Sequence, residues 1–167
     1  TLSRSADHPN ARVAPRDRLA LLPLGRFPLE VVADGQFVGP VRAPELPALA
    51  AVLAAFFATP VDTMPALVFP AAHINRRIRD GRSQYDARDL LDRADRRLPA
   101  DAHGMLLLVN VDLFVFSDQD YAYGWSTLHN RLAVVGFSRL DPGPHAPFAG
   151  AETPEPLLRR GLRLAVH

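Results

Sequence analysis

Histidine is the residue type in this chain best suited to bind a metal ion or to move a proton near neutral pH, and six are present. Five of them stand apart, in segments that we expect to be exposed loops, with no H-x-x-x-H or H-x-H spacing: His8, His73, His103, His129 and His145. The sixth, His167, closes a helical pattern, where the helix dipole favours a histidine. The chain has no cysteine, which excludes disulfides and thiolate ligands. Spacing alone therefore predicts no metal site.

Other catalytic chemistries have little support in the sequence. GFSRL at 136–140 has the first glycine and the serine of a G-x-S-x-G nucleophile elbow, but it lacks the second glycine and precedes a loop. Glycine-rich phosphate-binding loops are absent from the sequence. Asp112, Asp118 and Asp120 gather where an apolar strand ends, which indicates an acidic rim or a loop cap rather than a pair of catalytic carboxylates.

The basic residues are all arginines, nineteen in number, and four of them form a local patch. The patch consists of Arg76, Arg77, Arg79 and Arg82, and it could attract phosphate or nucleic acid. Five aspartates between positions 80 and 95 follow at once, and the formal net charge of the chain is +1. We therefore expect these aspartates to neutralise the arginine patch within the protein, and we expect no nucleic-acid partner.

Length and hydropathy indicate one globular unit. The chain has 167 residues, of which 48% are hydrophobic, so it can bury a sizeable core. The longest apolar run, at 48–57, is shorter than the roughly 20 residues that cross a bilayer, so we expect a soluble protein without a membrane partner. Residues 1–18 are polar and aperiodic, which predicts a flexible segment before a single unit at 19–167.

The elements that would have to position these side chains alternate between strand and helix patterns. Strands are predicted at 19–25, 65–70, 104–116, 121–128 and 131–140, with a hairpin over 27–41 around Asp34-Gly35. Helices are predicted at 43–59, 82–99 and 155–167, and an arginine-rich loop at 71–82. This order predicts an α/β fold with one mixed β-sheet of four or five strands and helices packed on it.

Composition also predicts where these elements lie. The 104–116 strand is too apolar for an edge, so we place it in the centre of the sheet and the polar, aromatic 121–128 strand at an edge. Gly124 and Gly136 interrupt strands, which indicates bulges or a close approach of backbones. The 43–59 helix is apolar on nearly all sides and is expected to be buried on most of them. Ser83 or Asp86 would cap the helix that follows.

An ordered series of motifs resembles the archaemetzincins, zinc metallopeptidases of the metzincin clan. The motifs are PLG at 23–25, RSQYDARDLL at 82–91, LLLVNVDLFVF at 106–116, YAYGWSTLHNRLAVVGFSRLDP at 121–142 and LLRRGLRLAVH at 157–167. In that family an R-x-Q-Y element leads into a helix, and V-D-L-[FY], [FY]-G and [ST]-x-R-L strands follow before the active-site helix. Residues 25–44 resemble an insertion relative to the family pattern.

The resemblance implies a metzincin-like N-terminal subdomain that ends in the active-site helix. His167 would be the first histidine of H-E-x-x-H-x-x-G-x-x-H and hence a zinc ligand. A zinc-bound water, deprotonated by the motif's glutamate, would attack the carbonyl of a peptide or protein substrate. That substrate would add to the 121–128 strand, with backbone groups near Gly124, Trp125 and Ser126 as the substrate-binding candidates.

The chain starts at Thr1 without an initiator methionine, and it stops one residue before the expected glutamate. We therefore expect an internal piece of a longer, cytoplasmic peptidase, inactive by itself because one imidazole cannot hold a catalytic zinc ion. A non-catalytic α/β module, either a degenerate metzincin or a domain that binds a peptide or partner, stays open as the alternative. Trp125 packing over its strand is at least as compatible with the sequence as a substrate contact.

Overall fold

The computed structural model describes residues 15–25, 30–33, 36–40 and 45–140. Within these ranges, short 3-10 helices lie at Ala71–His73 and Asp95–Arg97, and the helices are α1 (Leu46–Phe57) and α2 (Ala87–Ala94). The strands are β1 (Arg18–Leu24), β2 (Glu30–Ala33), β3 (Gln36–Pro40), β4 (Val61–Thr63), β5 (Arg76–Arg79), β6 (Arg82–Asp86), β7 (Ala102–Val109), β8 (Asp112–Phe114), β9 (Gly124–Thr127) and β10 (Leu132–Gly136).

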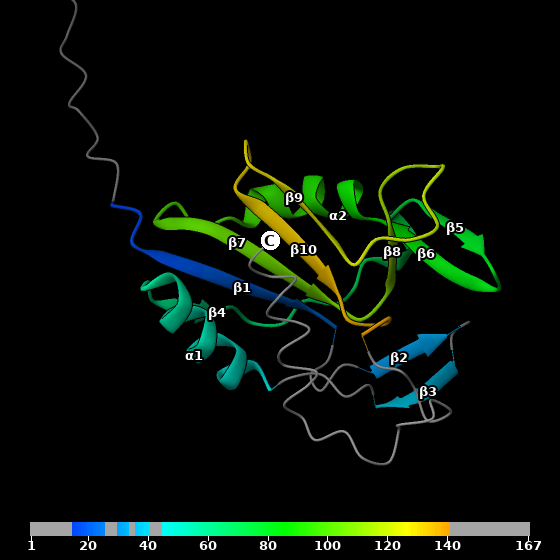
Figure 1. The fold of residues 1–167 in the computed structure, drawn as a ribbon, viewed down its shortest axis with the longest axis horizontal. Helices are drawn as coiled ribbons and strands as arrows, with labels where there is room; N and C mark the ends of the chain where they lie inside the picture. Colours follow the sequence, from blue (N-terminus) through cyan, green and yellow to red (C-terminus); the bar gives the residue numbers. More distant parts are fainter. Residues whose placement is uncertain (1–14, 26–29, 34–35, 41–44, 141–167) are drawn as a thin grey trace, which may run out of the picture.

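The main sheet has five strands in the order β4-β1-β7-β10-β9 (Figure 1). The β1–β4, β1–β7 and β7–β10 pairs are parallel, whereas β9 runs antiparallel to β10. The predicted mixed sheet is therefore confirmed, with the apolar β7 at its centre and β9 at one edge. The apolar run of β7 suits a central position because both of its faces are covered.

Helices cover both faces of this sheet. Alternate residues of a strand point to opposite faces, and the buried residues of β1 divide accordingly between two apolar clusters. Leu22 packs in the cluster that contains Leu90 and Leu91 of α2, whereas Leu21 packs with Leu49 and Leu53 of α1. The two helices thus lie on opposite sides of the sheet, and the fold is a three-layer α/β arrangement.

Two smaller sheets accompany the main one. β2 and β3 pair antiparallel, as the Asp34-Gly35 signal predicted. β5 and β6 also form an antiparallel hairpin, and β8 adds to β6 in parallel. The prediction of a loop at 71–82 is therefore wrong. Asp80 and Gly81 both have positive φ, as a two-residue type I′ turn requires, so Asp80-Gly81 is a second Asp-Gly hairpin signal, which lies among arginines.

Other boundaries differ from the predicted ones. Residues 65–70 contribute only an isolated bridge between Leu67 and Leu24, and the strand in this region is β4. The predicted 104–116 strand divides into β7 and β8, which belong to different sheets. Helix α2 begins at residue 87, since the preceding residues form β6, and Asp86 is its N-cap, with Oδ1 accepting from the Arg88 N–H at 2.9 Å.

Helix α1 is less buried than its composition predicts. Only Leu49 and Leu53 are fully buried, and Phe56 is 60% exposed, because the helix lies over β1 and β4 at one side of the sheet. No helix within the described ranges is long and apolar enough to cross a bilayer. Strand β1 begins at Arg18, so the predicted flexible segment 1–18 does not extend to residue 18. Residues 1–14 of that segment lie outside the described residues. So does the predicted helix at 155–167, which includes His167.

Candidate functional site

Strand β9 forms the outer edge of the main sheet and carries the predicted peptide-binding residues. It pairs with β10 on one side, and no strand of the described ranges extends along its other side. An extended chain can add to such an edge through main-chain hydrogen bonds. The edge is therefore the part of the sheet that can bind a peptide in the predicted way.

The β9–β10 register shows which backbone groups face outward. The Gly136 N–H donates to the Tyr123 carbonyl at 2.8 Å, so these two residues form a hydrogen-bonded pair. Such pairs alternate along an antiparallel ladder, and Trp125 therefore faces β10 with its backbone while Gly124 and Ser126 face away from it. The outward N–H of Ala122 is already used, because it donates to the Leu113 carbonyl at 2.7 Å. The open edge thus begins at Gly124.

The two non-glycine candidates have different surroundings. The Trp125 side chain packs against the apolar cluster beneath α2, and its ring meets the Phe116 ring edge-on at a centroid distance of 5.6 Å. Ser126 is exposed. The structure thus gives Trp125 a packing role through its side chain, and it leaves the backbone of Gly124 and Ser126 as the groups that a peptide could reach.

Gly124 allows a close approach of β9 to β10. A Cβ atom at this position would lie 2.4 Å from the Val134 carbonyl oxygen, closer than real Cβ contacts. At Gly136 a Cβ would lie 2.8 Å from the Val111 carbonyl oxygen. The prediction that these glycines mark close backbone approaches is therefore confirmed.

A loop, residues 115–121, leads into β9, is exposed apart from the buried Val115, and ends in aromatic side chains. Tyr121 and Tyr123 meet edge-on at a centroid distance of 5.3 Å, and both are more than one-third exposed. The Arg139 guanidinium lies over the Tyr121 ring, 3.9 Å from its centroid. Aromatic faces of this kind hold a cation in place and offer apolar area to a bound chain.

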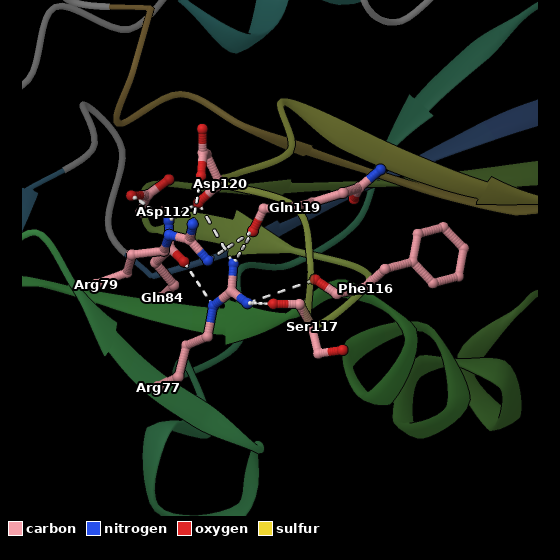
Figure 2. A network of polar contacts seen from close by, with 8 residues as sticks. All are labelled: Arg77, Arg79, Gln84, Asp112, Phe116, Ser117, Gln119 and Asp120. Carbon is pink, nitrogen blue, oxygen red and sulfur yellow. Dashed lines mark hydrogen bonds and ion pairs between the residues drawn. The ribbon is translucent and has the colours of Figure 1, made fainter.

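A polar network ties this loop to the β5–β6 hairpin (Figure 2). Arg77 on β5 donates from Nε to Gln84 Oε1 at 2.8 Å and from Nη1 to the Ser117 carbonyl at 2.9 Å. Arg79 forms an ion pair with Asp120 at 2.5 Å. Two members of the arginine patch, Arg77 and Arg79, are thus paired within the protein. Their partners are loop carbonyls and Asp120 rather than the aspartates that follow the patch in sequence, so the predicted source of neutralisation is wrong.

The network continues into a buried ion pair. Gln84 is fully buried, and its Nε2 donates to Asp112 Oδ2 at 3.1 Å and to the Asp120 carbonyl at 2.7 Å. The Arg139 guanidinium donates two hydrogen bonds of 2.6 Å to the two carboxylate oxygens of Asp112, which makes a bidentate ion pair. These hydrogen bonds, more than the neighbouring charges, raise the pKa of the Arg139 guanidinium.

Three of the sequence motifs therefore meet in one place. Gln84 comes from the R-x-Q-Y element, Asp112 from V-D-L-F and Arg139 from the F-S-R-L segment at 137–140. The motifs alone assign no role to Gln84, and the sequence predicts Asp112 only as part of an acidic rim or a loop cap. For Asp112 and Arg139 the available signal was a charged residue beside an apolar strand, since buried charges need partners.

The described residues hold no group of three or more His, Cys, Asp or Glu side chains that could bind a metal ion. Asp112 is paired with Arg139 and Asp120 with Arg79, so these carboxylates do not converge on one point. His73, His103 and His129 are exposed, as predicted, although His103 lies in β7 rather than in a loop. His167 is outside the described residues, so the structure neither supports nor opposes it as a ligand.

A groove of about 610 Å³ lies elsewhere, between α2 and the segment around residues 67–73. Its floor is largely apolar and comes from β1 and α2, and its rim includes His73, Arg96 and Arg97. None of Gly124, Trp125 and Ser126 lines it. The groove is thus separate from the β9 edge.

Comparison with solved structures identifies the fold. The chain is similar to an archaemetzincin from Archaeoglobus fulgidus in complex with malonate, with a TM-score of 0.57 and 20% identity over 90% of this chain and 73% of that one. It is also similar to an archaemetzincin from Methanopyrus kandleri (TM-score 0.56, 20% identity, 93% and 71% of the two chains) and to a zinc-dependent peptidase from Methanocorpusculum labreanum (0.56, 23%, 85% and 73%).

No protein-family model matches the chain, and no curated protein sequence matches it. At 20–23% identity the structural likenesses show the fold alone. The chain has the mixed α/β fold of the archaemetzincins, which confirms the fold class that the motifs predicted.

Proposed function

We propose that this chain supplies the peptide-binding sheet of a zinc-dependent peptidase and that the substrate adds as a strand along β9. The observation that supports this most directly is the open edge at Gly124 and Ser126 in a fold shared with zinc-dependent peptidases. An extended peptide presents alternating N–H and C=O groups, so it can pair with the two outward-facing residues. Binding of this kind depends on backbone groups and fits peptides of many sequences.

The residues described by the structure do not form a ligand set for zinc. We propose His167 as one ligand, on the basis of its place after the LLRRGLRLA sequence. Zinc in such an enzyme would supply Lewis-acid activation of a water molecule. The chain's own contribution in this proposal is to hold the scissile peptide extended and in register along β9, which is how positioning lowers a reaction barrier.

Peptide binding can be tested by NMR on the ¹⁵N-labelled 167-residue chain. The probe is an acetylated and amidated hexapeptide of alternating valine and threonine. We expect its amide shift changes to concentrate on β9, and we expect them to disappear in Ser126→Pro, which removes an outward N–H without removing a β9–β10 hydrogen bond. Ser126→Ala serves as the matched control. Shift changes that avoid β9, or that persist in Ser126→Pro, would refute strand addition at this edge.

The proposed ligand is tested by zinc titration calorimetry. Because one imidazole gives weak binding, we expect low affinity that His167→Ala abolishes, and unchanged affinity in the exposed-site controls His103→Ala and His129→Ala. Tight binding that survives His167→Ala would place the metal elsewhere. Peptide binding in the absence of any zinc affinity would favour the non-catalytic peptide-binding module over a peptidase.

A further inference from the structure

We propose that Arg77 is a positioning residue for the peptide-binding edge: it fixes the 115–121 loop and so holds the start of β9 in the geometry that strand addition requires. This inference rests on the proposed function. Arg77 lies on β5, outside the main sheet, and would not touch the peptide itself. Its effect would be transmitted through the backbone of the loop.

The guanidinium of Arg77 binds carbonyl groups along the whole loop (Figure 2). Beyond its contact with Gln84, all of its acceptors are backbone oxygens, namely those of Phe116, Ser117, Gln119 and Asp120. The contact to Gln119 is the shortest, and the ones to Phe116 and Asp120 are 3.4 and 3.3 Å long. One planar cation therefore sets the relative positions of four loop carbonyls, which a lysine with its single ammonium group could not do.

Arg77 is itself held firmly. Its guanidinium carbon lies 4.3 Å from the centroid of the Phe114 ring, and its Nε bonds to the fully buried Gln84. Gln84 is anchored in turn on Asp112, the partner of Arg139. The loop before β9 is thus connected through side chains to the segment that follows β10, and the β9–β10 hairpin is fastened at both of its ends.

Other side chains hold the loop mainly at its far end, where Gln84 and Arg79 bond to Asp120. Residues 116–120 are exposed and outside regular secondary structure, and they carry one internal backbone hydrogen bond, 3.3 Å from the Gln119 N–H to the Phe116 carbonyl. Water can replace Arg77 at exposed carbonyls, so loss of Arg77 should leave the fold intact while it frees the loop. Local order at the site, rather than global stability, is what this arginine provides.

The loop's far end lies directly against the open edge. The Ala122 N–H bonds to the Leu113 carbonyl, and two residues later Gly124 offers its outward backbone groups. A shift of the loop would carry Ala122 with it and change the direction in which β9 begins. Since a peptide must match several donors and acceptors at once, a small displacement there lowers affinity.

Arg77→Ala tests the proposal, with Arg76→Ala as the matched control, because the Arg76 side chain is exposed and makes no polar contact within the described part of the chain. Arg77→Lys tests whether the positive charge alone suffices. For each variant, amide hydrogen exchange and NMR titration with the valine-threonine hexapeptide are measured well below the melting temperature. A residue with a merely structural role would change the melting temperature and leave both measurements on the folded protein unchanged.

We expect Arg77→Ala and Arg77→Lys to accelerate exchange at residues 117–122 and to weaken peptide binding by about tenfold or more, the effect of losing one or two net hydrogen bonds. Exchange in β1 and β7 should not change, and Arg76→Ala should match the wild type. Unchanged loop exchange in Arg77→Ala, or faster exchange with undiminished peptide binding, would overturn the proposal. Failure of the wild type to bind the peptide would instead refute the proposed function on which it rests.

Discussion

Removal of the Asp112 carboxylate should be among the most damaging single changes in the described part of this protein. The Asp112 side chain is only 5% exposed and accepts hydrogen bonds from Arg139 and Gln84. In Asp112→Ala the Arg139 guanidinium, 22% exposed, would lose its counter-ion while staying largely buried. Gln84 would lose one of the two acceptors of its amide group.

The size of the effect follows from the desolvation of the partner that remains. Breaking a buried ion pair from one side costs about 3–5 kcal/mol, since the remaining charge is left without compensation. A total stability of roughly 5–15 kcal/mol is usual for a domain, so this loss is a large share of it. For a chain of this size the melting temperature should fall by roughly 6–20 °C.

Urea denaturation of Asp112→Ala, followed by circular dichroism, measures this loss. Asp118→Ala is the matched control, because Asp118 is exposed and makes no polar contact within the described ranges; it should change the free energy of unfolding by less than about 0.5 kcal/mol. Combining Asp112→Leu with Arg139→Met should be less destabilising than Asp112→Leu alone, since no charge is then left unpaired. If Asp112→Ala lowers the free energy of unfolding by less than about 1 kcal/mol, water must replace Asp112 as the partner of the Arg139 guanidinium, and the ion pair is not effectively buried.

Three further predictions concern the edge strand, a helix cap and an exposed ion pair. Gly124→Ala should lower the free energy of unfolding by about 1–3 kcal/mol in urea denaturation, because its Cβ would press on a β10 carbonyl, and Ser126→Ala on the same strand should have little effect. Asp86→Ala should cost about 0.5–2 kcal/mol through loss of the α2 cap, with faster amide exchange in the first turn of the helix; unaltered exchange there would contradict the capping role. Hydrogen bonds from Arg18 lower the pKa of the Asp101 carboxyl below its ordinary value of 3.8. The stability that the ionised carboxylate contributes is therefore present above pH 3.8 and is lost as the pH falls through the lowered pKa. In acid unfolding, Asp101→Asn should accordingly lose less stability below pH 3.8 than the wild type does.

Much of the main sheet could be predicted because its strands differ in composition. The apolar run of β7 requires cover on both faces, and the polar, aromatic β9 does not, so their central and edge positions follow from hydropathy. The β5–β6 hairpin was missed for the converse reason. The strand Arg76–Arg79 lacks the apolar alternation that marks a half-buried strand. It is extended because it pairs with β6, while Arg77 and Arg79 bond to loop groups that are distant in sequence.

The candidate site, too, could be predicted from the sequence only in part. The edge position of β9 was predicted from its composition, and its peptide-binding role from the resemblance. The structure adds that Gly124 and Ser126 face outward, which only the register reveals. The network of Gln84, Asp112 and Arg139 joins residues 27 and 28 positions apart, and no local pattern specifies that pairing. The extent of burial of α1 likewise depended on where the sheet ends, which its own sequence does not encode.

The parallel pairing of β1 with β7 has a consequence for the order of events during synthesis. The neighbouring ion pair joins Arg18 to Asp101, which are 83 residues apart. At about 5–20 residues per second, a ribosome needs roughly 4–17 s to make the intervening chain. In that interval β4 and α1 can already pair with one side of β1 and cover one of its faces, while its other face waits for α2. Strand β1 is therefore partly covered early, and its other edge is paired only after β7 has left the ribosome.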